Sequence, residues 1–96
     1  MVVHIVMFRF KEENKEANIQ KVRALLEALP EKISTLKSME VGVDAVHSER
    51  SMDLVLTSKF EDWDGLEAYR IHPAHMEVVT LIKEVTIESR VVDYER

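Results

Sequence analysis

The sequence predicts an α+β domain with the element order β-α-β-β-α-β. Its 96 residues are the size of one domain, so we expect a single domain over residues 1–96. Four segments show the apolar spacing of strands, and the regions between them show the three- and four-residue spacing of helices. Apolar residues make up 46% of the chain, which is the usual level for a globular domain.

The first two predicted elements are a strand over residues 2–10 and a helix over about residues 13–29. Both faces of the strand are largely apolar, which is typical of a central strand that is covered on both sides. One face holds His4, Val6, Phe8 and Phe10, and the other holds Val3, Ile5 and Met7. The helix is predicted from the spacing of Ile19, Val22, Leu25, Leu26 and Leu29, and Pro30 marks its end.

The next two strands are predicted to form a hairpin. Alternating apolar side chains occur in residues 38–47, at Met39, Val41, Val43 and Ala45. The same alternation occurs in residues 52–60, at Met52, Leu54, Leu56 and Phe60. The polar residues 47–50 favour a turn between the two strands, so we expect the strands to be neighbours.

Two short helices and a last strand complete the prediction. Asp62 is a suitable N-cap for a helix that carries Trp63, Leu66 and Tyr69. Pro73 favours the start of a second helix, whose inner face we expect to hold Met76, Val79 and Ile82. Residues 85–94 are strand-like. The complete order is that of the ferredoxin-like fold.

The sheet is predicted to need a cover on both faces. The helices form one layer and can cover only one face. We expect the other face to hold His4, Val6 and Phe8, and to pack against the same face of a second copy about a two-fold axis. The sequence therefore predicts a homodimer. Replacement of Val6 or Phe8 by Asp is expected to break the dimer and the fold, because a buried unpaired charge is costly.

Composition excludes several classes of protein. The formal net charge is −5, with 13 Lys and Arg scattered among 18 Asp and Glu, so we expect no nucleic-acid partner and no anionic membrane surface. No apolar run approaches the roughly 20 residues of a membrane span. Cysteine is absent, which excludes disulfides and thiolate metal sites. With no signal-peptide pattern at the start of the chain, these features favour a cytoplasmic location.

One heptad carries a specific resemblance. Residues 69–75 read Y-x-x-H-P-x-H, His4 opens the first apolar strand, and residues 91–94 read V-V-D-Y. In these motifs, and over essentially the whole chain, the sequence resembles the stress-responsive α/β-barrel (Dabb) family. That resemblance implies a dimeric α+β barrel. It does not imply one activity, because most members of the family have no assigned reaction.

One member of that family is a plant polyketide cyclase that forms olivetolic acid by aldol condensation, and its heptad is similar. The resemblance implies that Tyr69 and His75 are the catalytic pair, and that His4 lines the pocket. The residue types agree with that role. A helix start disfavours a cationic imidazole, so His75 is expected to be neutral and able to act as a general base. The Tyr69 hydroxyl could hold the enolate that forms. In the structural alternative, Tyr69 and His75 only fix the corner between two helices.

His72 and a metal site complete the candidates. His72 either caps the second helix or, together with His4, contacts a substrate. Three histidines, His4, His72 and His75, are a conceivable metal set. The HExxH spacing is absent and no carboxylate is obviously placed to complete the shell, so we expect neither a metal nor a cofactor.

Two functions follow from these observations. The first is a homodimer that binds a small apolar carbonyl compound and carries acid–base chemistry of the cyclase, isomerase or lyase type. The second is a noncatalytic stress-response or structural homodimer of the same fold. Related dimeric barrels also include monooxygenases, which no residue pattern here specifically supports. A cavity that touches His4, Tyr69 and His75 together would favour the first function, and a solid interior would favour the second.

Overall fold

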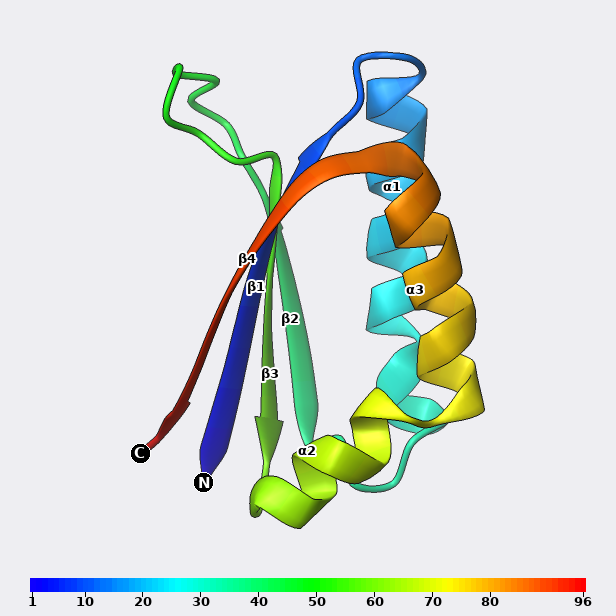
Figure 1. Cartoon of the computed structure of the whole chain (residues 1–96), viewed down its shortest axis with the longest axis vertical. Coiled ribbons are helices and arrows are strands. Elements are labelled where there is room, and N and C mark those ends of the chain that lie inside the picture. The colour runs from blue at the N-terminus through cyan, green and yellow to red at the C-terminus, as the bar shows by residue number, and fades with distance from the viewer.

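The structure is a computed structural model that describes residues 1–96. It contains four strands, three α-helices and a short 3₁₀ turn. In chain order these are β1 (Val2–Phe10), α1 (Lys15–Glu27), the 3₁₀ turn (Leu29–Glu31), β2 (Ser38–Val43), β3 (Leu54–Phe60), α2 (Trp63–Arg70), α3 (Pro73–Val85) and β4 (Thr86–Glu95). All three helices lie on one side of the sheet (Figure 1).

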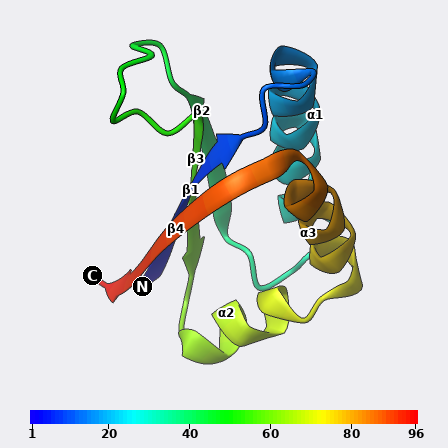
Figure 2. The same ribbon diagram turned by 45° about the horizontal axis from the view of Figure 1, so that its top comes forward.

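The four strands form one antiparallel sheet in the order β2-β3-β1-β4. This topology confirms the predicted ferredoxin-like α+β fold. The two terminal strands, β1 and β4, are neighbours, so the ends of the chain meet, and the Met1 amino group donates a hydrogen bond to the Arg96 carbonyl oxygen at 3.0 Å. Figure 2 shows β4 crossing beside β1 after it leaves α3.

The prediction of which sheet face the helices cover was wrong. His4, Val6 and Phe8 point towards the helices, where Val6 lies opposite Leu56 and Phe8 opposite Leu54. The outer face carries the alternate residues of β1, including Ile5 and Met7. Both faces of β1 are apolar, so its own pattern does not decide the side. The neighbouring strand β3 settles which face of β1 is covered by the helices. Leu54 and Leu56 of β3 are buried in the main core, and Phe8 and Val6 lie on the same face opposite them.

The main core lies between the sheet and the helices. It is a cluster of 17 buried apolar residues. They come from the inner face of the sheet, from the inner sides of the three helices, and from residues 29–36 between α1 and β2. Phe60 and Val22 are 0% exposed at its centre. Burial of this kind contributes roughly 25 cal/mol per Å² of apolar surface, so this cluster holds the helices against the sheet.

The hairpin strands are shorter than predicted. β2 ends at Val43 rather than at residue 47, and β3 begins at Leu54 rather than at Met52. The Asp44 carboxylate accepts a hydrogen bond from the His47 amide at 2.7 Å, which turns the chain away from the ladder. Residues 44–53 form a loop that projects beyond the sheet on the side away from the helices (Figures 1 and 2).

The two predicted helices after β3 begin where expected. The Asp62 side chain accepts a hydrogen bond from the Gly65 amide at 2.8 Å, and Pro73 is the first residue of α3. The inner face of α3 differs from the prediction at Met76, which is half exposed, because Val78 and Ile82 take the buried positions. No helix in the structure has the length and apolar character needed to cross a membrane.

Candidate active site

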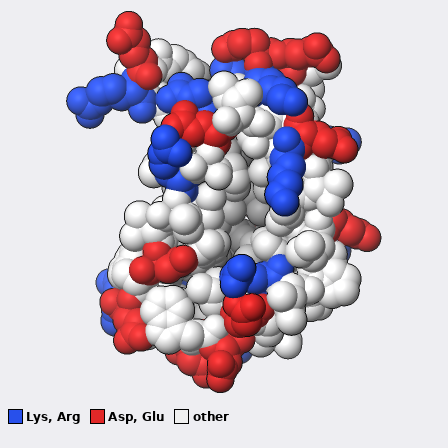
Figure 3. All heavy atoms as spheres, in the orientation of Figure 1, with Lys and Arg blue, Asp and Glu red and all other residues white.

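A single cavity of about 200 Å³ brings three of the predicted residues together. It lies between the inner face of the sheet and helix α3. Its lining residues are His4, Val6, Phe8, Leu26, Leu56, Tyr69, His75, Val79, Ile82, Lys83, Thr86 and Ser89. Figure 3 shows a hollow between β4 and α3 whose visible surface is mostly white, with Lys, Arg, Asp and Glu side chains along its edge and towards the two ends of the molecule. The interior is therefore not solid.

Tyr69 lies on the last turn of α2 and forms part of the cavity wall. It is 1% exposed, and its ring packs against Phe60 at 5.1 Å between centroids. Its hydroxyl makes no hydrogen bond within the chain. Thr35 Oγ1 is the only fully buried side-chain polar atom that lacks a hydrogen-bond partner. The Tyr69 hydroxyl also lacks a partner and is not in that class, so it is not fully buried. Burial raises the pKa of Tyr69 far above 10, so the phenol stays protonated and can donate a hydrogen bond.

His75 lies in the first turn of α3, and its ring centroid is 4.2 Å from that of Tyr69. Nδ1 is 3.0 Å from the carbonyl oxygen of Arg70. A carbonyl oxygen can only accept, so Nδ1 carries the proton. In the neutral ring, Nε2 then holds the free lone pair. Nε2 has no partner within the chain, which makes it the nitrogen available to a molecule in the cavity.

The electrostatic surroundings favour the neutral form of His75. Desolvation by burial is the largest effect and lowers the pKa of His75 below 6.5. The hydrogen bond to Arg70 acts in the opposite direction, and the positive charge of Arg70 and the neighbouring His4 and His72 lower the pKa further. The imidazole is therefore unprotonated at pH 7, as a general base must be.

His4 enters the cavity from β1 and is held by a partner that sequence reasoning missed. It lies directly opposite Asp93 in the β1–β4 ladder, and its Nδ1 hydrogen-bonds the Asp93 carboxylate. The His4 side chain is 14% exposed, and its ring is 6.3 Å from that of Tyr69. The carboxylate fixes the orientation of the imidazole, which leaves Nε2 for the cavity. Strand register was the missing signal, because it pairs residue 4 with residue 93.

His72 does not line the cavity. Its Nδ1 accepts a hydrogen bond from the Ala74 amide at 3.0 Å, so the side chain caps the start of α3. This is the structural role that was one of its two predicted interpretations. No cluster of three His, Asp or Glu side chains in the structure is arranged to hold a metal ion.

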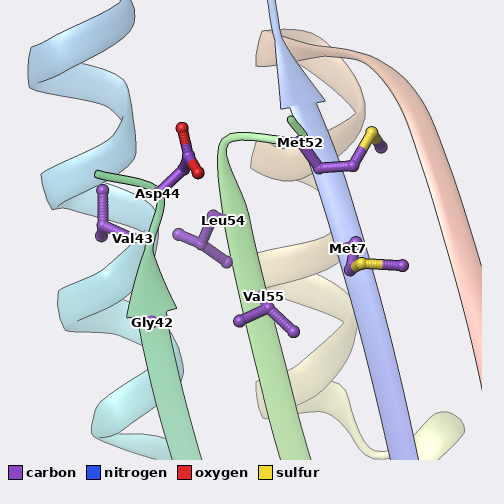
Figure 4. Close-up of a pocket in the computed structure, with 7 residues that line it drawn as sticks. All are labelled: Met7, Gly42, Val43, Asp44, Met52, Leu54 and Val55. Atoms are coloured by element: carbon purple, nitrogen blue, oxygen red, sulfur yellow. The ribbon is translucent and has the colours of Figure 1, made fainter. Parts of the chain in front are cut away.

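A second opening lies on the other side of the sheet. Its volume is about 290 Å³, and Figure 4 shows its lining at the loop end of the sheet. The lining residues are Met7, Gly42, Val43, Asp44, Met52, Leu54 and Val55. Asp44 is the only titratable group among them, so this opening lacks the acid and base pair of the first cavity.

Comparison with known proteins places the chain among proteins of one fold. The family model described as the stress responsive A/B barrel domain matches residues 2–96. A stress-response A/B barrel domain-containing protein of Arabidopsis thaliana is 35% identical over 77 residues, which cover 77% of this chain and 67% of that protein.

Solved structures agree with this assignment. A dimeric protein of unknown function and ferredoxin-like fold from Bacteroides fragilis is 31% identical, with a TM-score of 0.91 over 99% of this chain and 95% of that one. The hydroxynitrile lyase of Passiflora edulis shares the fold, with 18% identity and a TM-score of 0.86 over 97% and 90% of the two chains. The family match spans nearly every residue, including the heptad whose Tyr69 and His75 line the cavity. The chain belongs to the stress-responsive A/B barrel domain family.

Proposed function

We propose that this protein is a homodimeric acid–base enzyme that acts on a small carbonyl compound in the cavity between the sheet and α3. The observation that carries the proposal is the position of His75 beside Tyr69. One ring offers an unprotonated nitrogen, and the other offers a hydroxyl with no partner in the chain. Each group has the protonation state that its role needs at pH 7.

The chemistry follows from these two groups. His75 Nε2 removes a proton from the carbon next to the substrate carbonyl. The electron pair of that C–H bond forms the C=C bond of the enolate, and the π pair of the carbonyl group moves onto its oxygen. The Tyr69 hydroxyl donates a hydrogen bond to the enolate oxygen, which is worth on the order of 3 kcal/mol in comparable sites. The protonated imidazole then returns the proton to a carbon or oxygen of the product. Aldol cyclisations, isomerisations through an enol and lyase reactions that pass through an enolate all begin with such a step.

The apolar walls support a small apolar substrate. Val6, Phe8, Val79 and Ile82 line the space between the polar groups. The volume of about 200 Å³ is below the 300–1,000 Å³ that is usual for drug-sized ligands. His4, oriented by Asp93, is the third polar group at the same end and contacts the substrate in this proposal.

The homodimer is proposed through the outer face of the sheet. Ile5, Met7 and Val55 are half-buried on this face, while Val92 and Tyr94 on β4 are 55% and 40% exposed. An apolar sheet face of this kind needs a cover. The Bacteroides fragilis relative, which is 31% identical, is described as dimeric. The cavity lies on the opposite face. In this proposal the inner face of the sheet therefore binds the substrate and the outer face forms the dimer interface.

The proposed chemistry is tested by proton exchange, which needs no knowledge of the complete reaction. A panel of β-keto esters and short polyketide mimics is incubated with the protein in D₂O at pH 7, and loss of the α-proton signal is followed by NMR. Exchange above the buffer rate is expected for part of the panel, and His75→Ala should return it to the buffer rate. His47→Ala is the matched control, because His47 lies in the exposed loop. Exchange that survives His75→Ala within a few-fold contradicts the assignment.

The same experiment addresses the noncatalytic alternative. If no member of the panel exchanges faster than in buffer, and none shifts the resonances of cavity residues, the cavity has no ligand of this class. That pair of results would favour a noncatalytic homodimer over an enzyme. If His75→Ala unfolds the protein, His75→Gln is the second variant, since an amide keeps a donor for the Arg70 carbonyl oxygen.

A further inference from the structure

We propose that the substrate carries a carboxylate, which the Lys83 ammonium group and the Ser89 hydroxyl hold at the end of the cavity away from Tyr69 and His75. This inference rests on the proposed function and adds a substrate class to it. Lys83 is the only permanently charged residue among the twelve that line the cavity. It forms no ion pair within the chain, and the Ser89 hydroxyl has no hydrogen-bond partner there.

The register of the sheet separates two ends of the cavity. His4 lies opposite Asp93 at one end of the β1–β4 ladder, and Phe8 lies opposite Ser89 four residues along. Four residues of strand span about 13 Å. The Tyr69 ring is 6.3 Å from that of His4, so the acid–base groups belong to the first end.

Helix α3 gives the same separation from the other wall. His75 and Lys83 are eight residues apart on α3, which corresponds to about 12 Å of helix rise. A lysine side chain is long and flexible and leans towards the N-terminal side of its helix, so its ammonium group can reach back over the cavity. Both walls therefore separate the acid–base groups from Lys83 and Ser89 along the cavity.

The charges around the cavity also favour an anionic group at the Lys83 end. The Asp93 carboxylate lies behind His4, and its negative charge disfavours an anionic group at the acid–base end. The Arg70 guanidinium near His75 is already paired with the Glu67 carboxylate at 2.6 Å. At the other end, Lys83 is free to pair with an anion, and no acidic side chain lines the cavity. A molecule with an apolar middle, a carbonyl group at one end and a carboxylate at the other matches all three parts of the wall.

The inference is tested by binding rather than turnover, with a matched pair of probes. 3-Phenylpropanoate and 3-phenylpropanamide have the same shape and differ in charge. Their dissociation constants are measured from ¹⁵N–¹H shifts of Val79 and Ile82, which line the cavity. We expect the carboxylate to bind about three- to tenfold more tightly than the amide at low salt. Lys83→Gln should remove this preference, and Ser89→Ala should weaken it.

Lys21→Gln is the control, because Lys21 is an exposed lysine on α1 that lines no cavity. It should leave the preference unchanged. Equal binding of the two probes, a preference that survives Lys83→Gln, or failure of both probes to shift the cavity resonances would overturn the inference. A Lys83-dependent preference without any α-proton exchange would instead overturn only the proposed acid–base function.

Discussion

His4 and Asp93 lie directly opposite each other in the ladder between β1 and β4, and their side chains hydrogen-bond on the face that carries the cavity. The two residues are 89 positions apart in the chain. The contact ties the first strand to the last, and it fixes which nitrogen of His4 is left for the cavity. The arrangement of the acid–base end of the cavity thus depends on the correct pairing of β1 with β4.

Replacement of Asp93 by Asn tests the importance of this contact. The charge-assisted hydrogen bond is lost, and we expect the rate of substrate α-proton exchange to fall by about tenfold or more. The stability should change by less than about 1 kcal/mol, because the Asp93 side chain is 37% exposed. Glu95→Gln is the control on the same strand. An unchanged rate in Asp93→Asn would show that His4 needs no orienting partner.

Two variants of Tyr69 separate its contribution to core packing from its proposed role as a hydrogen-bond donor. Tyr69→Phe removes only a hydroxyl without a partner in the chain, so the unfolding free energy should change by less than about 1 kcal/mol. The exchange rate should fall by about 10²-fold, because the enolate loses its donor. Tyr69→Ala, in contrast, should cost about 3–5 kcal/mol through lost core packing. A rate in Tyr69→Phe equal to that of the wild type contradicts the donor role.

The pH dependence of stability reports the environment of His75. Its folded pKa is lowered, so the unfolded chain binds a proton at a higher pH than the folded chain does. The unfolding free energy should therefore be unaffected by this group well above pH 6.5 and should fall as the pH drops below that value, by at most about 1.4 kcal/mol per pH unit. Urea unfolding of His75→Gln between pH 8 and pH 5 should show a smaller loss than the wild type.

The matched control for this measurement is Lys21→Gln, because Lys21 is an exposed residue of α1 and is no part of the cavity. Its pH profile should follow that of the wild type. A His75→Gln profile that coincides with the wild type would mean that the imidazole titrates alike in the folded and unfolded chain.

The two faces of β1 should respond differently to a charge. Phe8 is 7% exposed in the main core, so Phe8→Asp should cost at least about 3 kcal/mol and unfold the chain. Ile5 lies on the outer face, so Ile5→Asp should keep the fold and dissociate the proposed dimer. Circular dichroism gives the fold, and light scattering gives the mass. A wild-type protein that is monomeric at micromolar concentration contradicts the dimer.

His72 is expected to act through the fold alone. Its side chain caps α3, and loss of an N-cap typically costs about 0.5–2 kcal/mol. His72→Ala should lower the melting temperature while the exchange rate stays within a few-fold of the wild type. A large loss of rate without a loss of stability would return His72 to the substrate-binding residues.

Patterns in the sequence were sufficient for the order of the elements and for the starts of β1, α2 and α3. The alternation in residues 2–10, the Asp62 cap and Pro73 each depend on local chemistry, and the structure has all three. The side of the sheet that the helices cover depends on long-range packing. Both faces of β1 are apolar, so the strand itself does not indicate which face meets the helices. For that reason the inner and outer faces of β1 were assigned the wrong way round.

The site shows the same division. Tyr69 and His75 are six residues apart, and a motif within one segment was sufficient to point to them. Lys83 and Ser89 reach the cavity, and Asp93 reaches His4, through strand register and the direction of α3, which no single segment contains. The Met76 prediction failed for a related reason, since helical spacing alone allows more than one register for the buried stripe, and contact with the sheet selects Val78 and Ile82.

The most direct test of the account is the tautomer of His75 in the native protein. Long-range ¹H–¹⁵N correlation spectra at pH 7 distinguish the two neutral forms and the imidazolium ion. The account predicts a neutral ring with the proton on Nδ1, bonded to the Arg70 carbonyl oxygen, and an Nε2 resonance that moves when a carbonyl ligand is added. A protonated Nε2 at pH 7, in either the other tautomer or the cation, would contradict the assignment of His75 as the base.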